Sequence, residues 1–156
     1  GERLAAQGGR SHRAGRVVQG AFRYLHADAA GGEHVVGYAF AGEFVGDYIS
    51  MCVDAPSQVT IEAMCVAAAL VVTGGRLEVF YRTDAAHERL GRTMAEHMLA
   101  EVYERLLERY AASPQQRYEA LLERCPALLQ MVSLRELASY LGVRPETLSR
   151  IRRRVR

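Results

Sequence analysis

The sequence predicts an α+β protein in which short antiparallel strands come first and helices follow. Three observations predict it: β-branched and aromatic runs between glycine-rich turns up to residue 73, one long apolar stripe over 84–110, and two short amphipathic segments around Gly142. Strands that precede helices, instead of alternating with them, favour a β-sandwich or barrel over βαβ units. We divide the chain into a strand-rich part at 1–83, a long helix at 84–111 and a helical part at 112–156.

Two pairs of strands are expected in the first part. The runs 16–25 and 34–40 are rich in β-branched and aromatic residues, and the segment HADAAGGE separates them, which predicts two strands joined by a turn. A second pair, at 57–64 and 68–73, follows with a short turn between its strands. The first 83 residues should therefore form the β-structured core.

The segment from Asp84 to Tyr110 changes to a helical period. Apolar residues recur every four positions, which predicts one long amphipathic helix. Such a stripe is typical of core packing, but it can also pair with a second copy of the chain. A further helix is expected over 114–124, with a break at Pro126. The stripe consists of Leu90, Met94, Met98, Val102, Leu106 and Tyr110, widened by Leu99, Tyr103 and Leu107.

The segment SLRELASYLGVRPETLSRIRRRVR has the spacing of a helix-turn-helix. Ser133 and Glu136 form the pattern of a capping box, which predicts a helix over 134–141. Gly142 supplies the turn, and Pro145 suits the first position of a second helix. Leu148 and Ile151 should be buried. The residues expected to face solvent, and DNA, are Arg144, Glu146, Thr147, Ser149, Arg150 and Arg153.

The charge distribution favours a nucleic-acid partner for this segment. The chain carries a net charge of only +2, but residues 133–156 hold seven arginines against two glutamates. An exposed arginine can form two hydrogen bonds to a guanine, and a glutamate can accept one from cytosine. We therefore expect double-stranded DNA as the partner; the alternative is an ordinary helical hairpin with a solvated charged face.

Composition restricts the remaining possibilities. The chain has 156 residues, 49% of them hydrophobic, enough for one core and a small appended module. No apolar run reaches the roughly 18 residues of a membrane span, and GERLAAQGGRSHR lacks the centre of a signal peptide, so we expect a cytoplasmic protein without a membrane partner. We see no catalytic cluster and no helical zinc pattern, so we expect no enzyme activity, no metal and no cofactor.

The stretch ELASYLGVRPETLSRIRR resembles the DNA-binding motif of the Crp/Fnr family of bacterial transcription regulators. The resemblance implies that Glu146, Ser149 and Arg150 read bases and that Thr147 contacts a phosphate. It implies a cyclic-nucleotide-binding-like β-roll (a double-stranded β-helix) before the long helix, which would be a dimerisation helix, and RNA polymerase as a candidate partner. The family's β-hairpin wing is missing or reduced to a tail, Arg152 to Arg156, after the second helix, and the roll begins abruptly for this family.

Residues 40–64 resemble the phosphate-binding cassette of cyclic-nucleotide domains. Gly46 and Asp47 take the places of the glycine and the ribose-binding acid, but Ser57 stands where the family has a phosphate-neutralising arginine, and Gln58 stands at the serine's place. A buried phosphate without a cation would keep its desolvation cost. We therefore expect Asp47 to be a turn and cap residue.

The base-binding side of the cassette also departs from the family. Val102 and Tyr103 replace the small hydroxyl residues that meet adenine in cyclic-AMP-binding members. If the chain has an effector, we expect it to be an unknown small molecule other than cyclic AMP. The candidate pocket then consists of Gly46, Asp47, Ser57, Gln58, Val102 and Tyr103.

Three functions remain as hypotheses. The first is a dimeric transcription regulator on an inverted-repeat operator whose roll does not bind cyclic AMP. The second is a regulator that binds a cyclic nucleotide through non-standard contacts. The third is a protein-interaction domain without DNA binding. A nucleotide titration separates the first two, and a salt-dependent DNA-binding assay tests the third.

Overall fold

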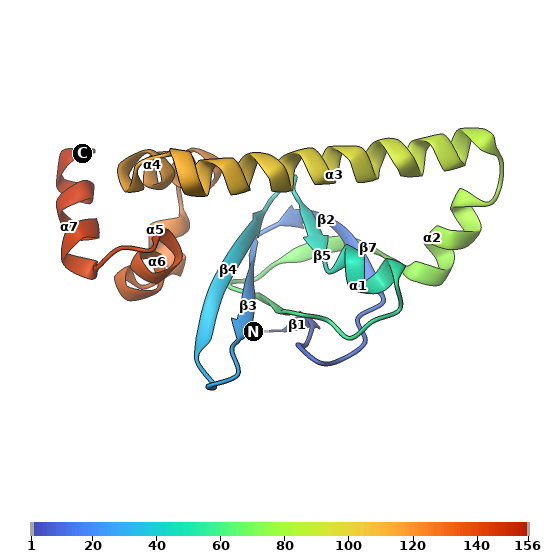
Figure 1. Ribbon diagram of the computed structural model, residues 1–156, viewed down its shortest axis with the longest axis horizontal. Helices are drawn as coiled ribbons and strands as arrows, with labels where there is room; N and C mark the ends of the chain where they lie inside the picture. The colour runs from blue at the N-terminus through green and yellow to red at the C-terminus, as the bar shows by residue number, and fades with distance from the viewer. Residues whose placement is uncertain (1, 156) are drawn as a thin grey trace.

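The computed structural model describes residues 2–155, in which two antiparallel sheets are followed by helices (Figure 1). One sheet has the strand order β1-β6-β3-β4 and the other β5-β2-β7. We call the two sheets together the roll. Its strands are β1 Arg3–Ala5, β2 Arg13–Gln19, β3 Ala21–Ala27, β4 Glu33–Phe40, β5 Phe44–Gly46, β6 Thr60–Ala63 and β7 Ala68–Thr73.

The single strand predicted over 16–25 is wrong, because the segment forms two strands that belong to different sheets. Gly20 separates β2 from β3 with φ at +81°, a conformation that a side chain would strain. A Cβ there would also lie 2.6 Å from the backbone oxygen of Val66. The chain can therefore change sheets at this glycine. The predicted hairpin that follows is confirmed, since β3 pairs with β4.

The second predicted strand pair is also wrong as a pair. Both strands exist, at β6 and β7, but they do not pair with each other. β6 lies between β1 and β3, whereas β7 pairs with β2 in the other sheet. The short connection between them crosses from one sheet to the other. Sequence spacing suggested a hairpin, but the long-range partners decide the pairing.

Among the described residues, helix α1 lies between strands β5 and β6 of the roll, and the other helices follow the last strand, β7. The longest, α3, runs along the long axis of the molecule above the strands (Figure 1). We call the four helices that follow it the helical module. The bounds are α1 Tyr48–Cys52, α2 Gly74–Tyr81, α3 Ala85–Ala111, α4 Pro114–Arg124, α5 Leu128–Met131, α6 Leu134–Leu141 and α7 Pro145–Arg154.

The predicted helices over 84–110, 114–124 and 134–141 are confirmed, and the caps explain their starts. Asp84 caps α3 by accepting hydrogen bonds from the backbone N–H groups of Ala86 and His87, at 2.8 and 3.0 Å. α4 begins with a reciprocal capping box between Ser113 and Gln116. The short helices α2 and α5 were not predicted. No helix within residues 2–155 is long and apolar enough to cross a membrane.

Two apolar clusters divide the interior. One lies within the roll, around Val17, Val45 and Ile61. The other joins the roll to the helical module, because Tyr38 and Phe40 of β4 pack with the buried faces of α4, α5, α6 and α7. The helical module therefore shares a core with the roll and is not a separate body on a linker. The residues of the helical module that are buried in this shared core are Tyr118, Leu121, Leu128, Leu137, Ala138, Leu141, Leu148 and Ile151.

Candidate DNA-binding face and effector sites

Gly142 makes the turn between α6 and α7. Its φ of +67° places it in the left-handed region, which glycine occupies without strain. The N–H of Gly142 donates to the carbonyl of Ser139 at 3.0 Å, and the N–H of Val143 donates to that of Ala138 at 2.9 Å. This is the hydrogen-bond pattern of a Schellman motif, which ends α6 and redirects the chain into α7.

α7 has one buried face and one exposed face. Leu148 and Ile151 pack into the core of the helical module, as the sequence predicted. The helix itself lies at the end of the molecule's long axis, away from the roll (Figure 1). Of the six residues expected to face solvent, four are exposed, Arg144, Glu146, Arg150 and Arg153, and two are half-buried, Thr147 and Ser149.

Two details of this face differ from the sequence prediction. Arg152, Arg153 and Arg154 lie in the last turn of α7 and do not follow the helix as a tail. Three arginines in the last turn complement the partial negative charge of a helix C-terminus, which favours continued helix there. In addition, Arg150 donates a hydrogen bond to the Thr147 hydroxyl at 3.3 Å, so the predicted base reader and phosphate contact touch each other. Arg156 lies outside the described residues.

The capping box predicted at Ser133 and Glu136 is only half formed. The Ser133 hydroxyl accepts from the backbone N–H of Glu136 at 3.1 Å, as expected. The Glu136 carboxylate does not return to the cap but accepts from Arg23 at 3.0 Å and from the Tyr38 hydroxyl at 3.3 Å. Both partners belong to the roll, and an ionic partner outweighs a backbone amide that water can satisfy.

Arg23 links the helix-turn-helix to the roll. Besides Glu136 it donates to Glu62 on the neighbouring strand, with Nε 2.9 Å from the carboxylate. The hydrogen bond from Arg23 lowers the pKa of Glu62, with burial acting in the opposite direction. Burial raises the pKa of the Tyr38 hydroxyl, which therefore stays protonated and donates. We call Arg23, Glu62 and Glu136 the first latch.

A second latch joins α4 to the turn between β4 and β5. Arg124 donates to both carboxylate oxygens of Glu43, at 2.9 and 2.8 Å, and its guanidinium lies 5.0 Å from the centre of the Phe40 ring. Burial alone would raise the pKa of Glu43, but the bonds from Arg124 outweigh it and the pKa is lowered. Arg124 and Glu43 are 29% and 24% exposed, so water screens this pair only in part.

Asp47 serves as the cap of α1, as the sequence predicted. Its carboxylate accepts from the Ser50 N–H and hydroxyl, from the Ser57 hydroxyl at 2.7 Å and from the Gln58 N–H at 3.2 Å. Burial opposes ionisation, yet the Ser50 and Ser57 bonds lower the pKa of Asp47. Gly46 precedes it with φ at +143°. The carboxylate is thus committed to the protein's own loop.

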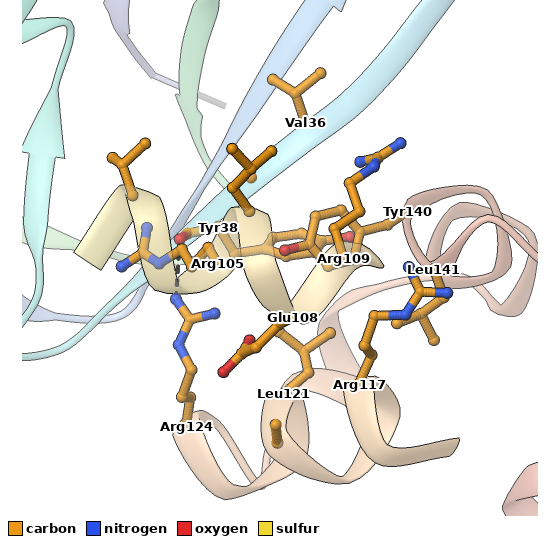
Figure 2. Close-up of a pocket in the computed structure, with 14 residues that line it drawn as sticks. Val36, Tyr38, Arg105, Glu108, Arg109, Arg117, Leu121, Arg124, Tyr140 and Leu141 are labelled. Atoms are coloured by element: carbon orange, nitrogen blue, oxygen red, sulfur yellow. Dashed lines mark hydrogen bonds between the residues drawn. The ribbon is translucent and has the colours of Figure 1, made fainter. Parts of the chain in front are cut away.

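The other two candidate effector residues lie on α3. Val102 and Tyr103 are 61% and 58% exposed, and both Ser57 and Asp47 belong to the segment between β5 and β6. Val102 lines a cavity at the junction of the roll and the helical module, which Figure 2 shows and which none of the cassette residues lines. Val102 and the cassette therefore do not share this cavity.

The apolar stripe of α3 is largely uncovered within residues 2–155. Gly91 is the one residue of the helix that is buried, and it is covered by Tyr81 of α2. Leu90 and Leu106 are each 48% exposed, Met94 is 43% exposed, and Met98 is half-buried. Close packing of this helix is therefore found mainly against α2, at one end.

No family model and no curated protein matches this sequence. Solved structures do match. FixK2 from Bradyrhizobium japonicum is 20% identical with a TM-score of 0.77, covering 99% of this chain and 79% of its own. A CRP-family transcriptional regulator from Thermus thermophilus is 17% identical, with a TM-score of 0.63 and coverage of 99% and 80%. A protein from Eubacterium rectale classed as a Crp/Fnr-family regulator is 15% identical, with a TM-score of 0.68 and coverage of 99% and 74%.

Each of these similarities covers both the roll and the helical module, with the elements in the same order along the chain. The predicted β-roll, long helix and helix-turn-helix therefore have the arrangement of those regulators. The chain has the fold of the Crp/Fnr transcription regulators.

Proposed function

We propose that this chain is a sequence-specific DNA-binding transcription regulator that binds an inverted-repeat operator as a homodimer. The observation that carries the proposal is α7, a helix with a buried apolar face and an exposed face of arginines and a glutamate. Its outward position leaves this face free to enter a major groove. Structural relatives that are transcription regulators support the same function.

The homodimer is part of this proposal because of α3. An uncovered apolar stripe on a helix of 27 residues costs solvation free energy that a second copy would recover. One recognition helix contacts only a few base pairs, so two helices related by a two-fold axis supply the specificity.

We further propose that the roll does not bind cyclic AMP. The Asp47 carboxylate already accepts bonds from Ser50, Ser57 and Gln58, so a ribose hydroxyl would have to compete with them. No arginine stands in the cassette between residues 40 and 64 to neutralise a phosphate. The desolvation cost of a bound cyclic phosphate would not be offset by any ion pair from the cassette.

Selection of bound sequences from a random DNA pool tests the main proposal. We expect an inverted repeat whose half-sites are centred about 10 base pairs apart, or a multiple of that spacing. Arg150→Glu should abolish selection, whereas Arg76→Glu, an exposed position on α2 far from α7, is the matched control. Recovery of no enriched sequence with the unaltered protein would contradict DNA recognition, and calorimetry with cyclic AMP tests the roll separately.

A further inference from the structure

A cavity lies where the roll, α3 and the helical module meet (Figure 2). Its volume is about 320 Å³, at the small end of the range for ligand sites. Its lining comes from β4, the end of α3, α4 and α6. A molecule that fills the cavity would contact both the roll and the helical module. The walls are formed by Val36, Gly37, Tyr38, Val102, Arg105, Leu106, Glu108, Arg109, Arg117, Ala120, Leu121, Arg124, Tyr140 and Leu141.

The lining carries more positive than negative charge. It holds four arginines and one glutamate, Glu108. Two of the arginines are engaged: Arg105 pairs with Glu101 at 3.2 Å, and Arg124 pairs with Glu43. Arg109 and Arg117 form no ion pair within residues 2–155. The two free cationic groups therefore come from the end of α3 and from the first turns of α4.

Arg117 is the most informative of these side chains. It is half-buried, and its Nε–H is covered by protein without a hydrogen-bond acceptor among the described residues. A covered donor without an acceptor costs free energy, and a partly desolvated guanidinium without a counter-ion costs more. An anion beside it would offset that cost, and a carboxylate matches the planar geometry of a guanidinium.

The rest of the lining is apolar or aromatic. Leu121 and Leu141 are almost fully buried, and the Tyr140 ring lies edge-on to Tyr38 with ring centres 4.8 Å apart. These groups can cover a hydrocarbon or aromatic body but offer little to a second charged group. We propose that this cavity binds a small organic carboxylate whose anionic end pairs with Arg117 and whose apolar body lies against Leu121 and Tyr140.

Because of the position of the cavity, a bound carboxylate should affect DNA binding, an inference that rests on the proposed DNA-binding function. A bound carboxylate would contact α3 and β4 as well as α4 and α6, so it would stabilise the packing of the helical module against the roll. If the protein binds DNA in this packed form, the ligand and the operator strengthen each other's binding by the same factor. Binding itself does not depend on this coupling and is measured separately.

Calorimetry on the full chain tests the binding site with benzoate, phenylacetate, hexanoate and inorganic phosphate as probes. We expect at least one carboxylate to bind with a Kd at or below about 1 mM, and Arg117→Gln to weaken it at least about tenfold. Arg135→Gln, an exposed arginine of α6 outside the cavity, should leave it unchanged. Ala120→Leu fills the cavity without removing charge and should also abolish binding.

The opposing results are equally definite. The proposal is overturned if no carboxylate binds at that concentration, if phosphate alone binds, or if the affinity of the bound carboxylate is unchanged by Arg117→Gln or by Ala120→Leu. DNA affinity is then measured with and without the carboxylate that binds. An unchanged DNA affinity overturns the coupling alone, whereas a chain that selects no operator sequence fails the proposed function and leaves the calorimetric result intact.

Discussion

Glu136, in the first turn of the first helix of the helix-turn-helix, accepts a hydrogen bond from Arg23 of strand β3 at 3.0 Å, across 113 positions of sequence. The two side chains are 17% and 32% exposed. Because Glu62 holds the same guanidinium, Arg23 is also fixed within the roll. The orientation of the DNA-binding helices is therefore tied to the sheet of the roll by a charged contact as well as by the shared core.

Glu136→Gln should weaken this first latch. The amide keeps the shape of the side chain but removes its charge, so the hydrogen bond from Arg23 loses its ionic part. We expect the free energy of unfolding in urea to fall by about 1 kcal/mol. Glu123→Gln, on α4 and outside the latches, is the control and should change it by less than about 0.5 kcal/mol. Equal effects of the two variants would show that the latch contributes nothing.

Stability should fall on acidification because of both latches. The folded protein lowers the pKa of Glu43 and of Glu62 below the ordinary value of 4.5. The contribution of these two carboxylates to the free energy of unfolding is therefore complete when the pH is above 4.5. It disappears as the pH falls through their lowered pKa values in the folded protein. Urea unfolding between neutral pH and about pH 3 measures the decrease. Glu43→Gln should make the curve shallower in this range, and an unchanged curve would contradict the role of Glu43.

Gly142→Ala should destabilise the helix-turn-helix through its backbone. Among residues 2–155, apart from the neighbours of Gly142 in the chain, no atom lies within 4 Å of the added Cβ, so the cost comes from the φ of +67°. We expect the free energy of unfolding to fall by about 1–2 kcal/mol. Gly75→Ala is a matched control, since its Cβ would also meet open space but its φ is not left-handed. If both variants are equally stable, the left-handed turn is not what holds α6 and α7.

Met98→Glu should prevent dimerisation through α3. A charge in the middle of the apolar stripe would be buried against the second copy without a partner. Sedimentation velocity should show a monomer for this variant and a dimer for the unaltered protein. His97→Glu places the same charge on the neighbouring, exposed position of the helix and should leave the dimer intact. A Met98→Glu protein that remains dimeric would assign the interface to another surface.

The arginines of α7 should separate into two roles. Arg150→Ala should reduce the preference for one G·C pair in each half-site by about 1–3 kcal/mol while most of the salt dependence remains. Arg153→Ala combined with Arg154→Ala should weaken binding to all sequences alike. This double variant should also flatten the slope of log K against log salt by about 0.9 for each phosphate that an arginine no longer neutralises. If Arg150→Ala costs the same on specific and random DNA, Arg150 contacts a phosphate.

The sequence determined the local features of this protein by itself. The bounds of α6, the left-handed turn at Gly142, the start of α7 at Pro145 and the long α3 all follow from caps, proline and glycine positions and the helical period of apolar residues. These signals act within a few residues of each other, so they can be read along the chain. The cap at Asp47 belongs to the same class, since its first partner is Ser50.

Only the tertiary structure decided which distant segments meet. Residues 16–25 belong to two different sheets that separate at Gly20, and β6 and β7 also lie in different sheets. The Glu136 carboxylate pairs with Arg23 instead of completing the expected capping box. The tertiary structure also brought Arg117 of α4 into one cavity with α3 and β4. Strand pairing and ion pairing across a hundred residues depend on the balance of burial and desolvation in the packed core. No local pattern of residue types encodes that balance.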